Sequence, residues 1–557
     1  MRMAVILMMT AVFASGCGNG PTGSHADLIL TGGHVLTQTD TPFPTPPTAV
    51  AMAAGKILYV GSDDQALQTK GPETRVVDLK GATVIPGLVD SHCHLYGLGK
   101  SLAQIDLMGT GSPEQILEIV GRDAVKFAAD SWIEGRGWDQ NDWEIKEYPH
   151  RRMLDGIIAD RPVLLRRVDG HAAWVNSEAL RRASITRDTP DPEGGEILRD
   201  EQGEPTGILI DNAGALVSEK IPDIGAEETR RRIKLAIDHC VAHGLTGVHE
   251  AGVKWERAQV YRDMAAAGDL DLRVYAMYDD LPATLEKAYA EGPVFTDDGM
   301  LTIRAIKLYA DGALGSRGAL LLENYSDRPD HRGLPVTPPD HMREVMAKGG
   351  RAGFQICTHA IGDGANRLVL DLCEEVLAEL NLEDARWRVE HAQILDPADI
   401  PRFGELGVIA AMQPVHCTSD MDWADERLGA ERLAGAYAWR SLLDSGAHLC
   451  YGTDFPVEKV NPLAGLYSAV TRTHPDGTPI GGWQPQEAVD AATALELYTA
   501  GSAFAGFREN ESGRVAENHQ ADLTILDGNP VTCAPADLLT MKVMMTIVNG
   551  RVVYENP

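Results

Sequence analysis

Eight short apolar runs, each followed by a stretch of helical character, constrain the fold of this chain more than any other feature. Runs of this kind are typical of strands that are buried on both faces of a parallel sheet. Eight strand–helix units are the number that closes a (β/α)8 barrel, so the sequence predicts an α/β fold with a TIM-like barrel. We place the strand ends near Asp90, His249, Tyr278, Tyr309, His359, His391, Pro414 and Asp454.

Both ends of the chain are rich in short β-type segments. Strand–turn–strand patterns follow residue 25, and residues 521–526 and 543–553 have the same character. Two β-rich ends around a long α/β middle predict one composite β-sandwich, formed jointly by residues 26–84 and 508–557. The barrel then occupies residues 85–507.

The segment between the first two barrel strands is unusually long, running roughly from Leu95 to Leu245. It contains helical stretches such as residues 113–129 and Gly/Pro-rich turns such as residues 189–195. We predict an inserted subdomain at about residues 96–243 that lies over the C-terminal mouth of the barrel. The alternative is a peripheral elaboration that makes no contact with the site.

The first 17 residues have the features of an export signal. Arg2 precedes a short apolar run, too short to span a bilayer, and small residues follow it. The ending Ala14-Ser15-Gly16-Cys17 resembles a bacterial lipobox, with Ala14 where leucine is usual. We therefore predict a signal peptide at 1–17, acylation of Cys17 and a flexible tether at 18–25. The expected location is the bacterial cell envelope, on the periplasmic side of the outer membrane. An ordinary signal peptide with a chance cysteine is the alternative.

The charge balance excludes two classes of partner. The chain carries 81 acidic and 50 basic residues, for a net charge of -31. Nucleic acids and anionic membrane surfaces both require a basic footprint, so we expect neither as a partner. Membrane contact is expected only through the lipid anchor. The eight cysteines show no paired spacing and do not predict a disulfide framework.

Polar side chains gather at the predicted strand ends. His92 and His94 lie two apart in a strand and so point to the same side, where they can share a metal ion. Catalytic groups of this architecture lie at the C-terminal ends of the strands. Each residue alone has a structural explanation, such as a helix N-cap for an aspartate or a surface position for a lysine. Together they predict a catalytic divalent metal, with Cys93 and Cys357 ranked below the histidines as ligands. The polar residues at these strand ends are His92, His94, Lys307, His359, His391 and Asp454.

The motifs around these residues resemble those of the amidohydrolase superfamily. In detail they resemble its YtcJ-like branch, the amidohydrolase 3 type, which includes N-substituted formamide deformylase. The resemblance covers nearly the whole mature chain and implies a composite β-sandwich, a barrel and an insertion. The matching stretches are 85–94, 137–139, 169–177, 244–248, 307–317, 358–365, 388–393 and 452–457.

The resemblance implies a ligand set for one or two divalent metals. His92 and His94 would bind the first metal together with Asp454, and His359 and His391 would bind the second. Lys307 would bridge the two as a carbamate formed with carbon dioxide, because a free ammonium has no lone pair to offer. Zinc suits imidazole and carboxylate ligands, although other divalent metals and a mononuclear site stay open.

A reaction follows from this set. The metal would lower the pKa of a bound water and so supply hydroxide. Asp454 would take the proton and return it to the leaving nitrogen. The predicted activity is hydrolysis of a non-peptide C–N bond in a small amide-type substrate. The alternatives are an esterase, lactonase or dipeptidase on the same centre, and a catalytically silent, lipid-anchored binding protein.

Six further residues are candidates for substrate binding. Three of them belong to the insertion and three lie in loops that follow barrel strands. Their structural alternatives are the insertion core for Trp138 and helix caps for the loop residues. A homodimer is also compatible with the sequence. The six candidates are Trp138, Asp139, His171, Asp311, Arg317 and Asp363.

Overall fold

The computed structural model describes residues 25–39, 43–129, 131–167, 171–192, 194–222 and 224–556. The predicted signal peptide, Cys17 and nearly all of the tether lie outside the described residues. Within the described part of the chain, no helix is long and apolar enough to cross a membrane.

Eight parallel strands lie side by side in one sheet, which confirms the predicted (β/α)8 barrel. A short ninth strand, β16 (Val294–Phe295), pairs antiparallel with β17 at its edge. The barrel strands are β7 (Leu88–Cys93), β14 (Leu245–Val253), β15 (Arg273–Tyr278), β17 (Leu301–Tyr309), β18 (Gln355–Ala360), β19 (Arg388–His391), β20 (Ile409–Met412) and β21 (Leu449–Tyr451).

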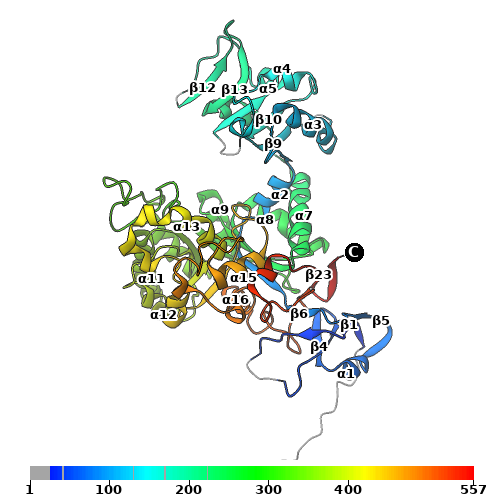
Figure 1. The fold of residues 1–557 in the computed structure, drawn as a ribbon. Coiled ribbons are helices and arrows are strands. Elements are labelled where there is room, and N and C mark those ends of the chain that lie inside the picture. The colour runs from blue at the N-terminus through cyan, green and yellow to red at the C-terminus, as the bar shows by residue number, and fades with distance from the viewer. Residues whose placement is uncertain are drawn as a thin grey trace, which may run out of the picture.

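Helices between and after the strands bury apolar side chains against the sheet (Figure 1). Gly268 after α8 and Gly407 after α12 adopt left-handed conformations that end these helices. The helices are α7 (Ala226–Ala242), α8 (Trp255–Ala267), α9 (Pro282–Glu291), α10 (Pro339–Arg351), α11 (Asp363–Leu380), α12 (Ile400–Leu406), α13 (Pro414–Leu428), α14 (Trp439–Asp444), α15 (Pro462–Thr471), α16 (Ala491–Leu497) and α17 (Ala500–Ala505).

The seam between the first and last barrel strands is closed by the segment that follows β21. The backbone N–H of Asp454 donates to the carbonyl oxygen of His92 at 2.8 Å, and His94 donates to Phe455 at 2.8 Å. The hydroxyl and the backbone N–H of Thr453 both donate to the carboxylate of Asp90. The seam therefore brings Asp454 beside His92 of β7 and His94, which directly follows β7; we call this pair the β7 histidines.

Several predicted strand ends differ from the observed ones by a few residues. The second strand continues past His249 to Val253, and the seventh stops at Met412 because Pro414 begins α13. The last strand stops at Tyr451, so Asp454 lies in the loop beyond it. Because this loop bonds to β7, Asp454 still lies at the C-terminal ends of the strands.

The composite β-sandwich joins both ends of the chain. One sheet has the order β4-β3-β1-β5, and the second has the order β2-β6-β22-β23-β24. Leu28 and Val50 from the N-terminal part pack in one core with Leu523 and Ile547 from the C-terminal part. The strands are β1 (Ala26–Thr31), β2 (His34–Val35), β3 (Ala49–Ala53), β4 (Lys56–Gly61), β5 (Lys70–Asp78), β6 (Thr83–Pro86), β22 (Leu523–Leu526), β23 (Val543–Val548) and β24 (Arg551–Glu555), with helix α1 (Asp63–Leu67) after β4.

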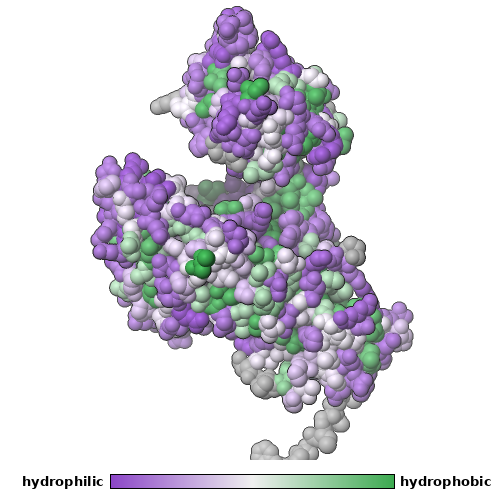
Figure 2. Space-filling view, in the orientation of Figure 1, coloured by the Kyte–Doolittle hydropathy of each residue, from purple (hydrophilic) through white to green (hydrophobic). Residues whose placement is uncertain are grey.

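The insertion after β7 is a six-stranded sheet with its own helices and core. It joins the barrel near α2 and α7, which pack so closely that a side chain on Gly99 would meet the backbone of Arg232. Figure 1 shows the insertion standing clear of the barrel, and Figure 2 shows an open hollow between the two. Its elements are α2 (Leu95–Leu102), β8 (Ile105–Asp106), α3 (Pro113–Asp123), β9 (Ile133–Trp138), α4 (Arg151–Asp155), β10 (Val163–Arg167), β11 (Ala172–Val175), α5 (Ser177–Arg182), β12 (Gly195–Arg199), β13 (Pro205–Asp211) and α6 (Ala213–Ser218).

Candidate active site

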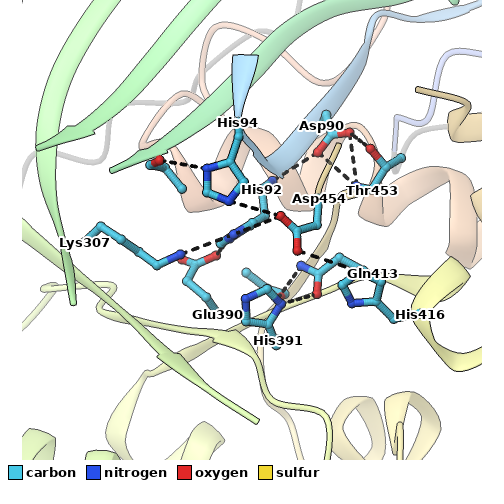
Figure 3. Close-up of polar contacts among 12 residues, drawn as sticks. Asp90, His92, His94, Lys307, Glu390, His391, Gln413, His416, Thr453 and Asp454 are labelled. Atoms are coloured by element: carbon cyan, nitrogen blue, oxygen red, sulfur yellow. Dashed lines mark hydrogen bonds and ion pairs between the residues drawn. The ribbon is translucent and has the colours of Figure 1, made fainter. Parts of the chain in front are cut away.

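Five of the six predicted metal ligands, all except His359, are shown converging at the C-terminal ends of the barrel strands in Figure 3. Ligand atoms of His92, His391 and Asp454 all lie within 4.8 Å of one another. The ring centroids of His92 and His391 are 4.7 Å apart, and those of His359 and His391 are 4.5 Å apart. Residues from strands far apart in the sequence thus form one cluster.

Hydrogen bonds at Nδ1 orient three of the histidines. His92 donates to the carboxylate of Glu390, His94 to the carbonyl oxygen of Ala251 at 3.1 Å, and His391 to Gln413 Oε1 at 2.8 Å. A ring that donates through Nδ1 carries a lone pair on Nε2. Such partners fix the tautomer and ring direction of metal-binding histidines.

Behind His92 lies a fully buried ion pair. Arg388 Nε is 2.8 Å from Glu390 Oε1, and its other nitrogens donate to His249 Nδ1 at 2.8 Å and to the Ser91 carbonyl at 2.6 Å. Burial raises the pKa of Glu390, but the charge of Arg388 outweighs it and holds that pKa below its usual value. Glu390 is therefore an anion that can hold the Nδ1–H of His92.

Three histidines of the cluster, His92, His359 and His391, are neutral at physiological pH. Burial lowers the pKa of His92 to about 4 and that of His359 to about 3, and it lowers the pKa of His391 well below its usual value. His359 Nε2 is buried and makes no hydrogen bond to the described residues. Neutral imidazoles with free lone pairs are the form that binds metals.

Asp454 lies between the histidines. Its Oδ1 is 3.3 Å from His94 Nε2 and 3.7 Å from His92 Nε2. Burial raises its pKa, but the interactions with His94 and the other nearby imidazoles outweigh burial and hold that pKa below its usual value. Asp454 is therefore ionised, and its φ of 58° turns the chain out of strand geometry at this point.

Lys307 of β17 points into the cluster rather than away from it (Figure 3). Its side chain is buried, with Nζ 3.3 Å from His92 Nε2 and 4.9 Å from the centre of the Tyr309 ring. Burial lowers its pKa, although Glu390 and Asp454 oppose that shift. Strand β17 thus places a buried amine beside the imidazole of His92.

His416, in the first turn of α13, completes the cluster on the side of His391. Its Nε2 is 3.7 Å from Asp454 Oδ2, and its ring lies 5.9 Å from that of His391 at an interplanar angle of 23°. The second oxygen of Asp454 thus faces a further imidazole, while the first faces the histidines of β7.

A family model described as the amidohydrolase family matches residues 75–554. The chain belongs to this family. The match spans the barrel, the insertion and the sandwich strands from β6 onward, so it covers every element that contributes a residue to the cluster. The family was the one expected from the strand-end motifs.

Relatives of this amidohydrolase align over nearly their full length. The putative amidohydrolase YtcJ of Bacillus subtilis is 36% identical, and the alignment covers 91% of this chain and 96% of that protein. The N-substituted formamide deformylase of Arthrobacter pascens is 28% identical, covering 91% of this chain and 95% of its own. The crystal structure of an uncharacterized metal-dependent hydrolase of Pyrococcus furiosus has a TM-score of 0.76 at 29% identity. The superposition covers 91% of this chain and 100% of that one. Members of this superfamily are hydrolases, and so is this chain.

The three substrate-binding candidates of this amidohydrolase's insertion each contact a neighbour in the same subdomain, and substrate binding by them stays a prediction. Trp138 is fully buried in the insertion core and donates to the carbonyl of Leu165 at 2.9 Å. Asp139 pairs with Arg167 at 2.8 Å, inside the same subdomain. His171 pairs with Asp211, and 74% of its side chain is exposed. These contacts join residues of the insertion to one another and so help to stabilise that subdomain.

Of the three loop candidates, Asp311 and Asp363 accept hydrogen bonds from backbone N–H groups, and Arg317 pairs with a side chain. Asp311 accepts the N–H groups of Leu320, Ile361 and Gly362, and its Oδ1 is 3.5 Å from His359 Nε2. Asp363 accepts from Leu322 and from Gly364. Arg317 forms an ion pair with Asp327 at 2.7 Å. Of the three, only Asp311 adjoins the cluster, where it supports the loop beside His359.

The cysteines take no part in the cluster. Burial raises the pKa of Cys93 and of Cys357 well above the usual value, which keeps both as thiols. All seven cysteines of the described residues are free. The ranking of histidines above thiolates therefore agrees with the chemistry of the site.

We expect Trp138→Phe to leave kcat and KM unchanged within about twofold, whereas Trp138→Ala should make the insertion more sensitive to proteolysis. Truncating a buried tryptophan costs about 3–5 kcal/mol, and the whole cost should fall on the insertion core. Steady-state kinetics and limited proteolysis of both variants check this. A KM at least tenfold higher in Trp138→Phe, with an intact insertion, would return Trp138 to the substrate site.

Proposed function

We propose that this amidohydrolase cleaves a non-peptide C–N bond of a small amide-type substrate with water activated by a divalent metal. The observation that carries the proposal is the convergence of histidine Nε2 atoms on the ionised carboxylate of Asp454. A cluster of buried acceptor groups without enough protons to share is costly unless a cation lies among them. The similar protein from Pyrococcus furiosus is described as a metal-dependent hydrolase, which supports the proposal.

The donor set fits such an ion. Two ligand atoms at about 2.0–2.1 Å from a tetrahedral zinc lie roughly 3.3 Å apart, close to the distances that separate Asp454 Oδ1 from the β7 histidines. The residues that would hold one or two ions are His92, His94, Lys307, His359, His391 and Asp454. When bound, a divalent metal supplies an acidified water and polarises the carbonyl of the substrate. Imidazole and carboxylate ligands favour zinc.

The protein's own contribution to the reaction centres on Asp454. Its carboxylate takes a proton as the water oxygen bonds to the carbonyl carbon, and the C=O electron pair moves to the carbonyl oxygen. When that pair returns, the C–N bond breaks and the nitrogen takes the proton from Asp454. One carboxylate can serve as base and then as acid because it adjoins both the water and the leaving group.

Lys307 is suited to become a carbamate. Burial lowers its pKa and so favours the neutral amine, whose lone pair can bond to the carbon of carbon dioxide as the nitrogen loses a proton. One C=O pair of carbon dioxide would move to oxygen and the proton would pass to solvent. The resulting anion would offer two oxygens to help hold one or two divalent metals. It would also remove the cost of an ammonium buried beside three histidines.

The substrate class rests on a relative. The Arthrobacter pascens enzyme is named for N-substituted formamides and is 28% identical over nearly its whole length. We infer that this chain acts on an N-formyl or other N-acyl amine. The test is a screen of the metal-replete protein against N-formyl amines, N-acyl amines, cyclic amides, dipeptides, esters and lactones. Turnover confined to esters and lactones would overturn the C–N assignment.

A further inference from the structure

His416 is a buried imidazole with one nitrogen unaccounted for. It is 8% exposed, and its Nε2 makes no hydrogen bond to any of the described residues. Leaving a buried polar group without a partner costs about 1–3 kcal/mol, so such groups call for an explanation. In Figure 3 the imidazole lies beside Asp454 and His391 at the centre of the site.

The tautomer of His416 is fixed by its neighbours. The amide nitrogen of Gln393 lies 3.3 Å from Asp420 Oδ2 and 3.4 Å from His416 Nδ1. Tyr437 donates its hydroxyl to the same carboxylate oxygen, which holds Asp420 in place. A carboxylate only accepts, so Gln393 must turn its NH2 group toward it, and the second N–H then faces His416. Nδ1 of His416 is therefore the acceptor, and Nε2 carries the hydrogen.

The N–H group at Nε2 of His416 lies on the side of Asp454. Nε2 is 3.7 Å from Asp454 Oδ2, too far for a direct hydrogen bond, while Asp454 Oδ1 faces the β7 histidines. His416 thus faces one oxygen of Asp454, while His92 and His94 face the other. A reacting carbon next to Asp454 would present one of its oxygens to His416.

We propose that His416 is a catalytic residue whose Nε2–H donates a hydrogen bond to the carbonyl oxygen of the substrate. This inference rests on the proposed hydrolysis. As water bonds to the carbonyl carbon, the C=O pair moves to that oxygen and the hydrogen bond strengthens. When the C–N bond breaks and Asp454 gives its proton to nitrogen, the pair returns and the bond weakens. His416 neither gains nor loses a proton.

The first test compares His416→Ala with His416→Gln and His416→Asn. Losing one donor to an oxyanion typically lowers kcat by about 10²–10³-fold, and we expect this for His416→Ala with KM changed much less. Glutamine places an amide nitrogen near the position of Nε2 and should restore part of kcat, whereas asparagine reaches only the position of Nδ1 and should not. The substrate probe is 4-nitroformanilide, and metal content per chain is measured in every variant.

A second test needs no turnover. Methylphosphonate mimics a tetrahedral carbon that bears oxyanions, and isothermal titration calorimetry on metal-reconstituted protein measures its affinity. We expect His416→Ala to bind it at least about tenfold more weakly than the wild type, with His416→Gln between the two. Equal affinity in wild type and His416→Ala, or no measurable binding in either, would overturn the inference.

The two tests separate the inference from the proposed function. If no N-acyl compound is hydrolysed but phosphonate binding depends on His416, the proposed reaction fails and the donor role stands. If 4-nitroformanilide is hydrolysed and His416→Ala keeps the wild-type kcat, the donor role fails and the proposed reaction stands.

Asp420→Asn adds a check on positioning, because Gln393 can then turn its oxygen to His416 and reverse the tautomer. That variant should lower kcat without changing metal content.

Discussion

Asp454→Asn should lower kcat for an N-acyl substrate by about a thousandfold or more. Removing a general base alone typically costs about 10²–10⁴-fold, and asparagine cannot take the proton of the attacking water. Asparagine keeps the size of the side chain and an oxygen that can still face His94, so the loop after β21 should keep its place. The measurement is steady-state kinetics on a substrate from the screen, with metal content determined in parallel.

Asp363→Asn is the matched control for that variant. It also exchanges one oxygen of a buried carboxylate near a strand end for an NH2 group. Among the described residues, however, Asp363 accepts hydrogen bonds only from the backbone N–H groups of Leu322 and Gly364. We expect kcat within a few-fold of the wild type and a lower melting temperature. A fall in kcat as large as that of Asp454→Asn would mean that loss of structure accounts for both.

Lys307→Met should lose most of the bound metal and nearly all of the activity. Methionine is apolar and similar in length, so it can fill the buried position without an unpaired charge. What it cannot do is form a carbamate. Lys307→Glu should keep part of the metal, because its shorter carboxylate still offers two oxygens. Elemental analysis of both variants measures the effect, and circular dichroism checks that they fold.

The carbamate itself can be observed. Wild-type protein incubated with ¹³C-labelled bicarbonate and metal should give a carbamate resonance that is absent from Lys307→Met. Short-chain carboxylic acids should restore part of the turnover of a Lys307→Ala variant by occupying the space that the side chain leaves. A fully metallated Lys307→Met with wild-type kcat would show that Lys307 is not a ligand.

Local sequence rules predicted much of the site. Residues two apart in a strand point to the same side, which placed His92 and His94 together. The C-terminal ends of parallel strands meet at one face, which brought Lys307, His359 and His391 to them. These arguments depend only on periodicity and on the order of elements along the chain.

Other features depend on backbone that breaks the strand pattern. In a regular strand Glu390 and His391 would point to opposite sides. A φ of 78° at His391 turns the chain, so that Glu390 bonds to His92 while His391 still enters the cluster. Periodicity cannot anticipate such a turn, although the adjacency of a glutamate and a histidine at a strand end was a usable signal.

The remaining residues depend on tertiary contacts. His416 belongs to the first turn of a helix, and its role emerges only through Gln393 and Asp454. Trp138 was a candidate for the substrate site because it belongs to the insertion, and its neighbours in space include Trp143 and Trp174 of the same subdomain. The sequence alone could not decide between a pocket wall and a core.

The measurement that tests the central claim most directly is the metal content of protein purified without chelator, set against its activity before and after metal removal. We predict about one or two divalent ions per chain, mostly zinc, loss of turnover when a chelator removes them, and recovery when zinc is returned. Buried, neutral histidines around an ionised aspartate are ready to bind such ions. Protein that holds no metal by elemental analysis and still turns over at the full rate would contradict the account.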